Sequence, residues 1–321
     1  MSGLVKISPL SQENYYTQEL SKHYQSVSQF KNFMECEART MAELSGEFTR
    51  ESTTAMLIGS YVDAWFEGTL EAFKAEHPEI FLKNGGLKAD FVQAETIIQR
   101  ISADANFMQY MSGEKQVIFT GTIENVPFKG KLDSYHAGRC IVDLKVMRDF
   151  EPVWKHGRKQ HFIEAWGYDI QGAVYQELVY QKTGEKLPFI ICAVTKEKVP
   201  DLEIMEIPQE RLDECLALVI EKAPDFQKIK TGEVMPERCG KCDFCKATKK
   251  LSGVIDYRKL MPDLYKSMNQ NQNPDQNQPV SVAEIVDIPE IPEFSEIPEK
   301  KHKKHKKHKK SKKRRKIVIK I

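Results

Sequence analysis

The sequence has no long hydrophobic run. Its longest apolar stretch, Leu187 to Val194, is far too short to cross a bilayer. The N-terminus lacks the basic-then-apolar layout of a secretory signal, so we expect a cytoplasmic protein without membrane contact. A hydrophobic fraction of 40% in 321 residues is still enough to bury a sizeable core, which excludes disorder throughout the chain.

Cysteine is also scarce. Seven cysteines in a chain of this length are too few and too unevenly spaced for a disulfide scaffold. Three of them crowd into residues 239–245, which indicates metal ligation in a reducing compartment. Cys140, Cys192 and Cys215 stand in apolar surroundings, where we expect small core residues.

Acidic residues are missing from the end of the chain. Residues 300–321 hold 14 Lys or Arg and no acid, which leaves 34 basic against 46 acidic residues in the first 299. The net charge of +2 therefore combines a body at −12 with a basic tail. Such a body does not coat polyanions, so any contact with nucleic acid must come from a local basic groove or from the tail.

Hydrophobic periodicity divides the chain into helices and strands. Apolar residues at helical spacing predict helices over 26–44, 53–68, 88–111, 162–183 and 209–231. Short β-prone runs separated by turn residues predict a three-stranded meander over 116–123, 126–135 and 139–146. A polar loop over 148–160 follows the meander, and the apolar run 187–194 predicts a buried strand. The fold class is therefore α/β, with the core order helix, three strands, helix, strand.

Composition also sets the domain limits that we expect. Residues 1–262 form one domain that includes the cysteine group. A polar and then acidic linker covers 263–299, and the basic tail covers 300–321. Few apolar groups in these last two segments can offset ordering entropy, so we expect both to be disordered.

Polar residues interrupt the apolar meander at three positions. Asp143 and Lys145 are two apart, so they share one face of a strand, and Asp133 lies on the preceding strand. A hairpin of these strands would bring both carboxylates and the ammonium together. Carboxylates suit Mg²⁺ or Mn²⁺, and a neighbouring lysine can orient water for phosphodiester hydrolysis. A solvated strand face is the alternative, because Asp-x-Lys is common by chance.

The spacing Asp133-x₉-Asp143-x-Lys145, in this order of elements, resembles the PD-(D/E)xK nuclease superfamily and implies its restriction-endonuclease-like core. Gln171 and Tyr175 resemble the Q-x-x-x-Y motif of the RecB-type branch. The resemblance implies that Asp133 and Asp143 bind the metal and that Lys145 orients water. It also implies that Gln171 and Tyr175 position DNA or brace the site.

Three features depart from the family pattern or lie outside it. Gly59 to Asp63 matches the upstream G-x-x-x-H frame with an aspartate in place of the histidine, so Asp63 is a further candidate metal ligand or an exposed helical residue. Leu132 stands where many members have proline. Glu114 is another candidate carboxylate, although a surface glutamate is the simpler interpretation.

The resemblance covers roughly residues 25–250 and is nearest to phage RecE-like exonucleases. It implies a metal-dependent exonuclease that digests linear duplex DNA from its ends and makes single strands for recombination. A single-strand annealing protein as partner and a homo-oligomeric ring are implied with it. The alternatives are a non-catalytic DNA-binding adaptor with this fold, or an endonuclease such as a CRISPR-type processing enzyme.

The cysteines Cys239, Cys242 and Cys245 form a dense C-x₂-C-x₂-C run. The run resembles the ligands of a [4Fe–4S] cluster, and RecB-type nucleases with such a cluster take one further cysteine from before the core. That residue would be Cys36. Tetrahedral Zn²⁺ on the same four thiolates is the alternative.

Basic residues follow the proposed metal site directly. Arg148, Lys155, Arg158 and Lys159 alternate with the aromatic Trp154 and Phe162. We expect this segment to track the DNA backbone, with a solvated loop as the alternative.

Overall fold

The computed structural model describes residues 9–251 and 253–260. The chain divides at Leu251 into two units, of which the second contributes one short turn, η2 (Tyr257–Leu260), to the described residues. The first unit contains the sheet and its helices. The proposed domain limit at 262, the linker and the basic tail lie outside the described residues.

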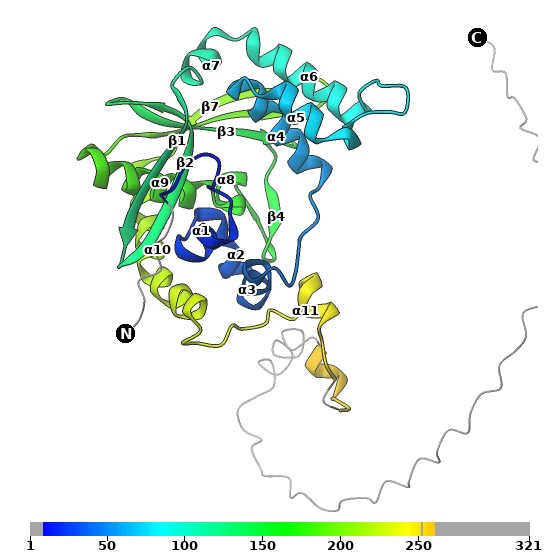
Figure 1. Cartoon of the computed structure of the whole chain (residues 1–321), viewed down its shortest axis with the longest axis vertical. Helices are drawn as coiled ribbons and strands as arrows, with labels where there is room; N and C mark the ends of the chain where they lie inside the picture. The colour runs from blue at the N-terminus through cyan, green and yellow to red at the C-terminus, as the bar shows by residue number, and fades with distance from the viewer. Residues whose placement is uncertain (1–8, 252, 261–321) are drawn as a thin grey trace, which may run out of the picture. The chain divides into compact units, whose positions relative to one another are not determined.

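A five-stranded mixed sheet forms the centre of the first unit (Figure 1). Its strands lie in the order β1 (Glu114–Ile123), β2 (Val126–His136), β3 (Cys140–Met147), β6 (Phe189–Thr195) and β7 (Leu202–Glu206). The first three are antiparallel, as the meander predicts, and β6 pairs parallel to β3. Because a parallel neighbour needs a crossover, a helical connection separates β3 from β6 in the chain.

The pairing of β2 with β3 is short and opens into a fork. It covers only Ser134 with Val142 and the two residue pairs nearer the turn. The next pair in this register would be Asp133 with Asp143, but the strands have already separated there. The Asp133 carboxylate instead accepts a hydrogen bond from the backbone N–H of Leu144 at 2.9 Å. The fork thus sets two carboxylates opposite each other on neighbouring strands.

Helices cover both faces of the sheet. One apolar cluster joins α2 (Val27–Glu35), α9 (Tyr168–Thr183) and α10 (Gln209–Thr231) to the sheet through residues such as Leu132, Phe189 and Ile191. The other joins α4 (Thr54–Glu67), α6 (Ala89–Ser102) and α7 (Ala105–Tyr110) to Val142, Ile190 and Cys192. Alternate residues of β6 thus face opposite layers, so the whole strand is buried. This arrangement confirms the predicted α/β core.

Several predicted elements are divided or were not anticipated. The helix over 26–44 breaks at the extended residue Cys36 into α2 and α3 (Glu37–Ser45), and the helix over 162–183 breaks at the left-handed Gly167 into α8 (Phe162–Trp166) and α9. The helix over 88–111 is likewise two helices, α6 and α7. The loop over 148–160 contains the hairpin of β4 (Val153–Lys155) and β5 (Arg158–Gln160). The remaining elements are α1 (Gln18–His23), α5 (Leu70–Glu76), η1 (Pro78–Ile80) and α11 (Asp243–Ala247).

None of the helices within the described ranges is both long and apolar enough to span a membrane.

Candidate active site and cysteine site

The two strand carboxylates differ in their surroundings. Asp143 is only 1% exposed, and its carboxylate lies in ion-pair contact with the Lys145 ammonium. Asp133 is partly buried and lines a cleft of about 970 Å³. Burial, Asp143 and Asp63 together raise the pKa of Asp133 well above its usual value. The carboxylates at the fork therefore carry more negative charge than the neighbouring cations neutralise.

Asp63 adds a third carboxylate from α4. It lines the same cleft, and no hydrogen bond or ion pair to its carboxylate is found among the described residues. Burial raises its pKa to about 7; the nearby Lys145 opposes this shift and Asp143 adds to it. The helical aspartate in the G-x-x-x-H frame thus faces the two strand carboxylates.

Among the residues that the structure describes, Lys145 is the one cation that forms an ion pair within this group. Its side chain is 16% exposed, and its ammonium lies 4.9 Å from the centre of the Tyr168 ring. Burial alone would lower the pKa of Lys145, but Asp143 and Asp133 raise it above the usual range. Lys145 therefore stays protonated at neutral pH and can donate hydrogen bonds, but it cannot accept a proton.

Helix α9 supplies the two remaining predicted residues. Gln171 donates a hydrogen bond from Nε2 to the Asp143 carboxylate at 2.6 Å. Tyr175, one helical turn further, lines the cleft with Gln171, and burial raises the pKa of its hydroxyl well above the usual value. The ring lies against Gly130, where an added Cβ would stand 2.9 Å from it. This close approach positions α9 over the fork.

The structure therefore brings Asp63, Asp133, Asp143, Lys145, Gln171 and Tyr175 together. Three carboxylates face one ammonium, which leaves an excess of negative charge at the cleft wall. Carboxylate oxygens are the ligands that Mg²⁺ and Mn²⁺ prefer, and a divalent cation would offset this excess. The residues present fit such a cation.

Sequence reasoning missed Lys31 and Tyr168. The Lys31 ammonium donates to the backbone carbonyl of Trp166 at 2.9 Å and lies 5.6 Å from the centre of the Tyr168 ring. Burial, and then the like charge of Lys145, lower the pKa of Lys31 to about 8. No local pattern signals these contacts, because they join α2 to the break between α8 and α9.

In the basic segment after β3, two residues that were expected to contact DNA, Phe162 and Lys155, make contacts within the protein instead. Phe162 is 3% exposed and stacks on Phe150, so it belongs to the core and cannot stack on a base. The Lys155 ammonium donates to the carbonyl of Ala165 at 2.7 Å. Trp154, Arg158 and Lys159 are largely solvent-exposed, but none of them lines the cleft. Glu114 is exposed at the start of β1, as a surface glutamate would be.

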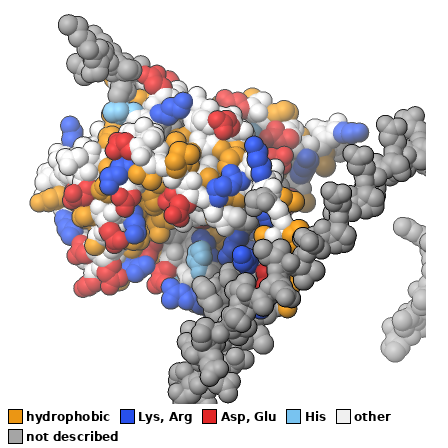
Figure 2. Space-filling model, turned by 90° about the horizontal axis from the view of Figure 1, so that it is seen from below, with side chains coloured by type: hydrophobic (Ala, Val, Ile, Leu, Met, Phe, Trp, Pro, Cys, Tyr) orange, Lys and Arg blue, Asp and Glu red, His pale blue; other side chains and the backbone are white. Residues whose placement is uncertain are grey.

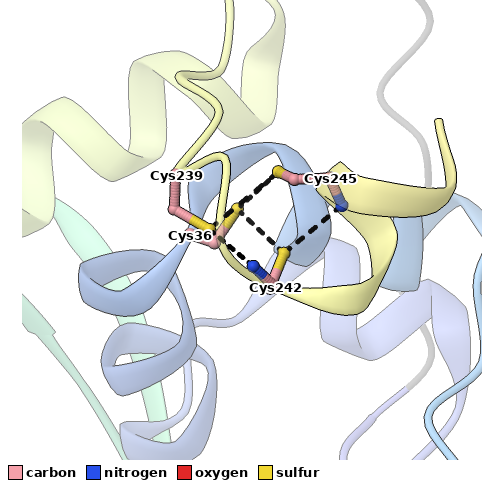
Figure 3. A group of neighbouring side chains, drawn as sticks. All are labelled: Cys36, Cys239, Cys242 and Cys245. Carbon is pink, nitrogen blue, oxygen red and sulfur yellow. Dashed lines mark hydrogen bonds between the residues drawn. The ribbon is translucent and has the colours of Figure 1, made fainter. Parts of the chain in front are cut away.

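A second site joins Cys36, Cys239, Cys242 and Cys245 (Figure 3). All four sulfur atoms lie within 4.8 Å of one another. Three of the Sγ–Sγ separations are 3.6 Å (Cys36 to Cys245), 3.7 Å (Cys36 to Cys242) and 4.0 Å (Cys239 to Cys245). Cys36, the N-cap residue of α3, thus meets Cys245 of α11 although 209 positions separate them in the chain.

Backbone N–H groups point at these sulfur atoms. Arg39 donates to Cys36, and Cys242 and Lys241 donate to Cys239, at 3.3–3.5 Å. Burial opposes ionisation of Cys239, but these backbone donors lower the pKa of its thiol to about 6. N–H donors stabilise thiolates, which are the form that binds metals. The donor set therefore fits a metal.

Comparison with known proteins agrees with this geometry. Residues 26–248 match the model of a family described as a PDDEXK-like domain of unknown function (DUF3799). The chain belongs to this PDDEXK-like family. Its nuclease-like core is the sheet and helices that carry the carboxylate cluster.

A solved structure is similar over most of the chain. It is the crystal structure of a protein from Eubacterium rectale described as a "putative exonuclease", with 47% identity and a TM-score of 0.76. The similarity covers 79% of this chain and 98% of the other. No curated protein matches the sequence. The family and this neighbour together support a nuclease function.

Proposed function

We propose that the protein is a metal-dependent DNA exonuclease, which hydrolyses phosphodiester bonds from the ends of linear duplex DNA. The observation that carries this proposal is the cluster of three carboxylates and one protonated lysine at the wall of a cleft. A non-catalytic adaptor would have no need to retain a carboxylate cluster that raises the pKa values of Asp63 and Asp133, because such a cluster costs stability. The description of the E. rectale neighbour supports action at DNA ends.

We assign roles from the contacts of each residue. Asp133 and Asp143 would hold Mg²⁺ or Mn²⁺, with Asp63 as the third ligand. The cation supplies Lewis-acid chemistry, since it polarises phosphate oxygens and makes water a better nucleophile near neutral pH. Lys145, which stays protonated, would orient the attacking water and offset charge that develops on the phosphate. Gln171 fixes the Asp143 carboxylate, and Tyr175 braces α9 against β2.

The products of such digestion would be nucleotides and a single strand for recombination. We include a single-strand annealing protein and a homo-oligomeric assembly in the proposal as the expected partners. These two expectations rest on the family resemblance alone.

For the cysteine site we propose a structural Zn²⁺ ion. A tetrahedral zinc ion with Zn–S bonds of about 2.3 Å requires sulfur separations of about 3.8 Å. Three of the six separations, 3.6, 3.7 and 4.0 Å, are close to this value, and all six are at most 4.8 Å. A [4Fe–4S] cluster has a separate iron for each thiolate, which requires wider spacing. The sequence favours the cluster, whereas the sulfur positions favour zinc.

The experiment for the proposed activity compares linear and covalently closed circular duplex DNA, each with Mg²⁺ and with a chelator. We expect progressive loss of the linear DNA with Mg²⁺ only, and an intact circle. Cleavage of the circle would identify an endonuclease. Binding of linear DNA without cleavage under any divalent ion would identify a non-catalytic protein.

A further inference from the structure

An N-terminal turn places two tyrosines at the cleft. Tyr15 and Tyr16 are the last two residues of the turn that begins at Gln12, and both line the cleft with Asp133. Their rings meet edge to face at 5.0 Å between centroids. Tyr15 is 6% exposed, whereas Tyr16 is 75% exposed. One ring is therefore fixed in the protein, and the second is presented to whatever enters the cleft.

The turn is held in place from both neighbouring strands. The Lys129 ammonium donates to the carbonyl of Tyr15 and lies 4.5 Å from the centre of its ring. Lys129 is 3% exposed, and burial lowers its pKa to about 8. On the other side, the Gln12 amide donates to the carbonyl of Gln116 on β1. Burying an ammonium costs free energy, so this anchor would be unfavourable for a turn with no function.

Lys131 lies between the exposed tyrosine and the carboxylates. Its ammonium is 4.9 Å from the centre of the Tyr16 ring and 5.7 Å from that of Tyr15. No ion pair of Lys131 is found in the described part of the chain; its charge acts on the carboxyls of Glu67 and Asp63 from a distance, and the aromatic rings are its direct contacts. It is therefore available to a phosphate.

The distance between Lys131 and Asp133 along β2 is similar to the distance between successive phosphates of a nucleic-acid strand. Lys131 and Asp133 are two residues apart and both line the cleft, so their Cα atoms are about 7 Å apart in an extended strand. This distance is comparable to that between successive phosphates of an extended nucleic-acid strand. A phosphate at the carboxylates would thus place the next phosphate near Lys131 and the base between them near Tyr16.

We propose that Tyr16 and Lys131 form a subsite for one unpaired nucleotide next to the phosphate being cut. The base stacks on the Tyr16 ring, and Lys131 contacts the adjoining phosphate. The ligand class is single-stranded nucleic acid, and stacking makes the subsite tolerant of base identity. This inference rests on the proposed nuclease function and extends it, because it requires a frayed or single-stranded end in the cleft.

The test measures equilibrium binding of the full-length protein to a duplex with a short single-stranded overhang, in chelator so that nothing is cut. A second probe has the same overhang with abasic residues. The variants are Tyr16→Ala and Tyr16→Phe, with Tyr180→Ala as the matched control, since Tyr180 is 48% exposed on α9 but does not line the cleft. Backbone contacts made elsewhere in the chain cancel in the ratio of affinities for the two probes.

Loss of one base stack is worth about 1–3 kcal/mol, so Tyr16→Ala should weaken binding of the intact overhang roughly fivefold to 150-fold. Tyr16→Phe and Tyr180→Ala should bind like the wild type. Abasic residues should cost the wild type the same factor and cost Tyr16→Ala nothing further. The subsite is ruled out by unchanged binding in Tyr16→Ala, by equal losses on both probes, or by a wild type that binds neither.

These results are separable from those on activity. If Tyr16→Ala weakens binding of the intact overhang as predicted but the wild type leaves linear DNA intact with Mg²⁺, the subsite is supported and the exonuclease proposal is wrong. A protein that digests linear DNA while Tyr16→Ala binds normally would retain the activity and lose the subsite.

Discussion

At the residue scale, the active-site carboxylates destabilise the metal-free folded chain. Asp63, Asp133 and Asp143 share one protonated neighbour, Lys145, and the folded chain holds their charges closer together and drier than the unfolded chain does. The elevated pKa values of Asp63 and Asp133 reflect this cost. Functional sites commonly retain such strain because the ligand that relieves it is part of the activity. The cluster should therefore behave differently with and without a divalent cation.

The first prediction concerns pH. The pKa of Asp63 is about 7 in the folded chain and near 3.8 in the unfolded chain, so folding binds a proton between these values. The free energy of unfolding of metal-free protein should fall as pH rises from about 4 to about 7, and then level off with respect to this group. Denaturant titrations in chelator measure it.

Asp63→Asn should reduce this pH dependence, because Asp133 is then the only carboxyl of the cluster with a raised pKa. Added Mg²⁺ should also flatten it by favouring the ionised form. Stability of the metal-free wild type that rises steadily over the same pH range would contradict the assigned surroundings of Asp63.

At the element scale, strand patterns predicted the first four strands of the sheet well. The limits of the helices were predicted less well, because local breaks divide several of them. Alternation in β1, β2 and β3 and the apolar run of β6 are short-range signals, because each strand face meets a different layer. The break at Cys36 depends on thiolates more than 200 positions away, and no periodicity contains it. Strand β7 was missed because it is a partly exposed edge strand next to β6.

The same distinction holds for the site. Asp133, Asp143, Lys145 and Gln171 stand at motif spacing on two strands and one helix, so sequence could place them together. Tyr16, Lys31 and Lys131 reach the cleft through packing between distant segments. Lys129, Lys131 and Asp133 alternate along β2, which the sequence shows. The sequence does not show that the turn before α1 packs against these residues and completes the cleft.

The second prediction tests the seat of α9 on the sheet. An added Cβ at Gly172 would stand 2.5 Å from the Phe189 ring and 2.9 Å from Leu212, so Gly172→Ala must push α9 away from β6 and α10. We expect a loss of about 1–3 kcal/mol in the free energy of unfolding. Activity should fall as well, because α9 carries Gln171.

Gly59→Ala is the matched control for Gly172→Ala. Gly59 also lies inside a helix, but nothing lies within 4 Å of an added Cβ there. The free energy of unfolding of Gly59→Ala should rise by about 0.5–1 kcal/mol, because alanine is favoured over glycine inside an unobstructed helix. Equal effects of the two substitutions in denaturant titrations would refute the packing argument.

The third prediction concerns the cysteine site, which ties α3 to α11. Purified protein should be colourless and contain one zinc per chain, and Cys36→Ser should lose the zinc. Without this link the melting temperature should fall by roughly 5–10 °C, and residues 233–251 should become sensitive to protease. Cys140→Ser, outside the site, should keep its zinc. Brown protein with about four irons per chain would instead identify the [4Fe–4S] cluster.

At the scale of the whole molecule, binding a polyanion requires cations to be concentrated where they are needed. Residues 1–299 carry a formal charge of −12. On the face shown in Figure 2, acidic and basic side chains of the described residues are interspersed with hydrophobic ones. The cleft lining includes three lysines, Lys31, Lys129 and Lys131, but also five carboxylates, so the cleft itself carries excess negative charge. A divalent cation at the carboxylates and the single lysine Lys131 would therefore have to supply the local positive charge that a phosphate needs.

The fourth prediction concerns the basic tail, residues 300–321, which holds 14 Lys or Arg and no acidic residue. A polycation gains affinity for duplex DNA by releasing counterions, so truncation after Pro262 should weaken binding at low salt. The slope of log affinity against log salt should become shallower by about 0.9 for each phosphate that the tail neutralises in the full-length protein. Metal-dependent cleavage at saturating DNA should be nearly intact. An unchanged salt slope would mean that the tail does not bind DNA.

The most direct test of the central claim is the initial rate at which Asp143→Asn digests linear duplex DNA in the presence of Mg²⁺. This substitution keeps the volume of the side chain and removes the ligand charge, and Glu114→Gln is the control at an exposed carboxylate outside the cleft. We predict that the rate falls by about a thousandfold or more, with Lys145→Ala similarly impaired, while Glu114→Gln digests at the wild-type rate. Digestion by Asp143→Asn at a rate close to that of the wild type would contradict the assignment of the active site.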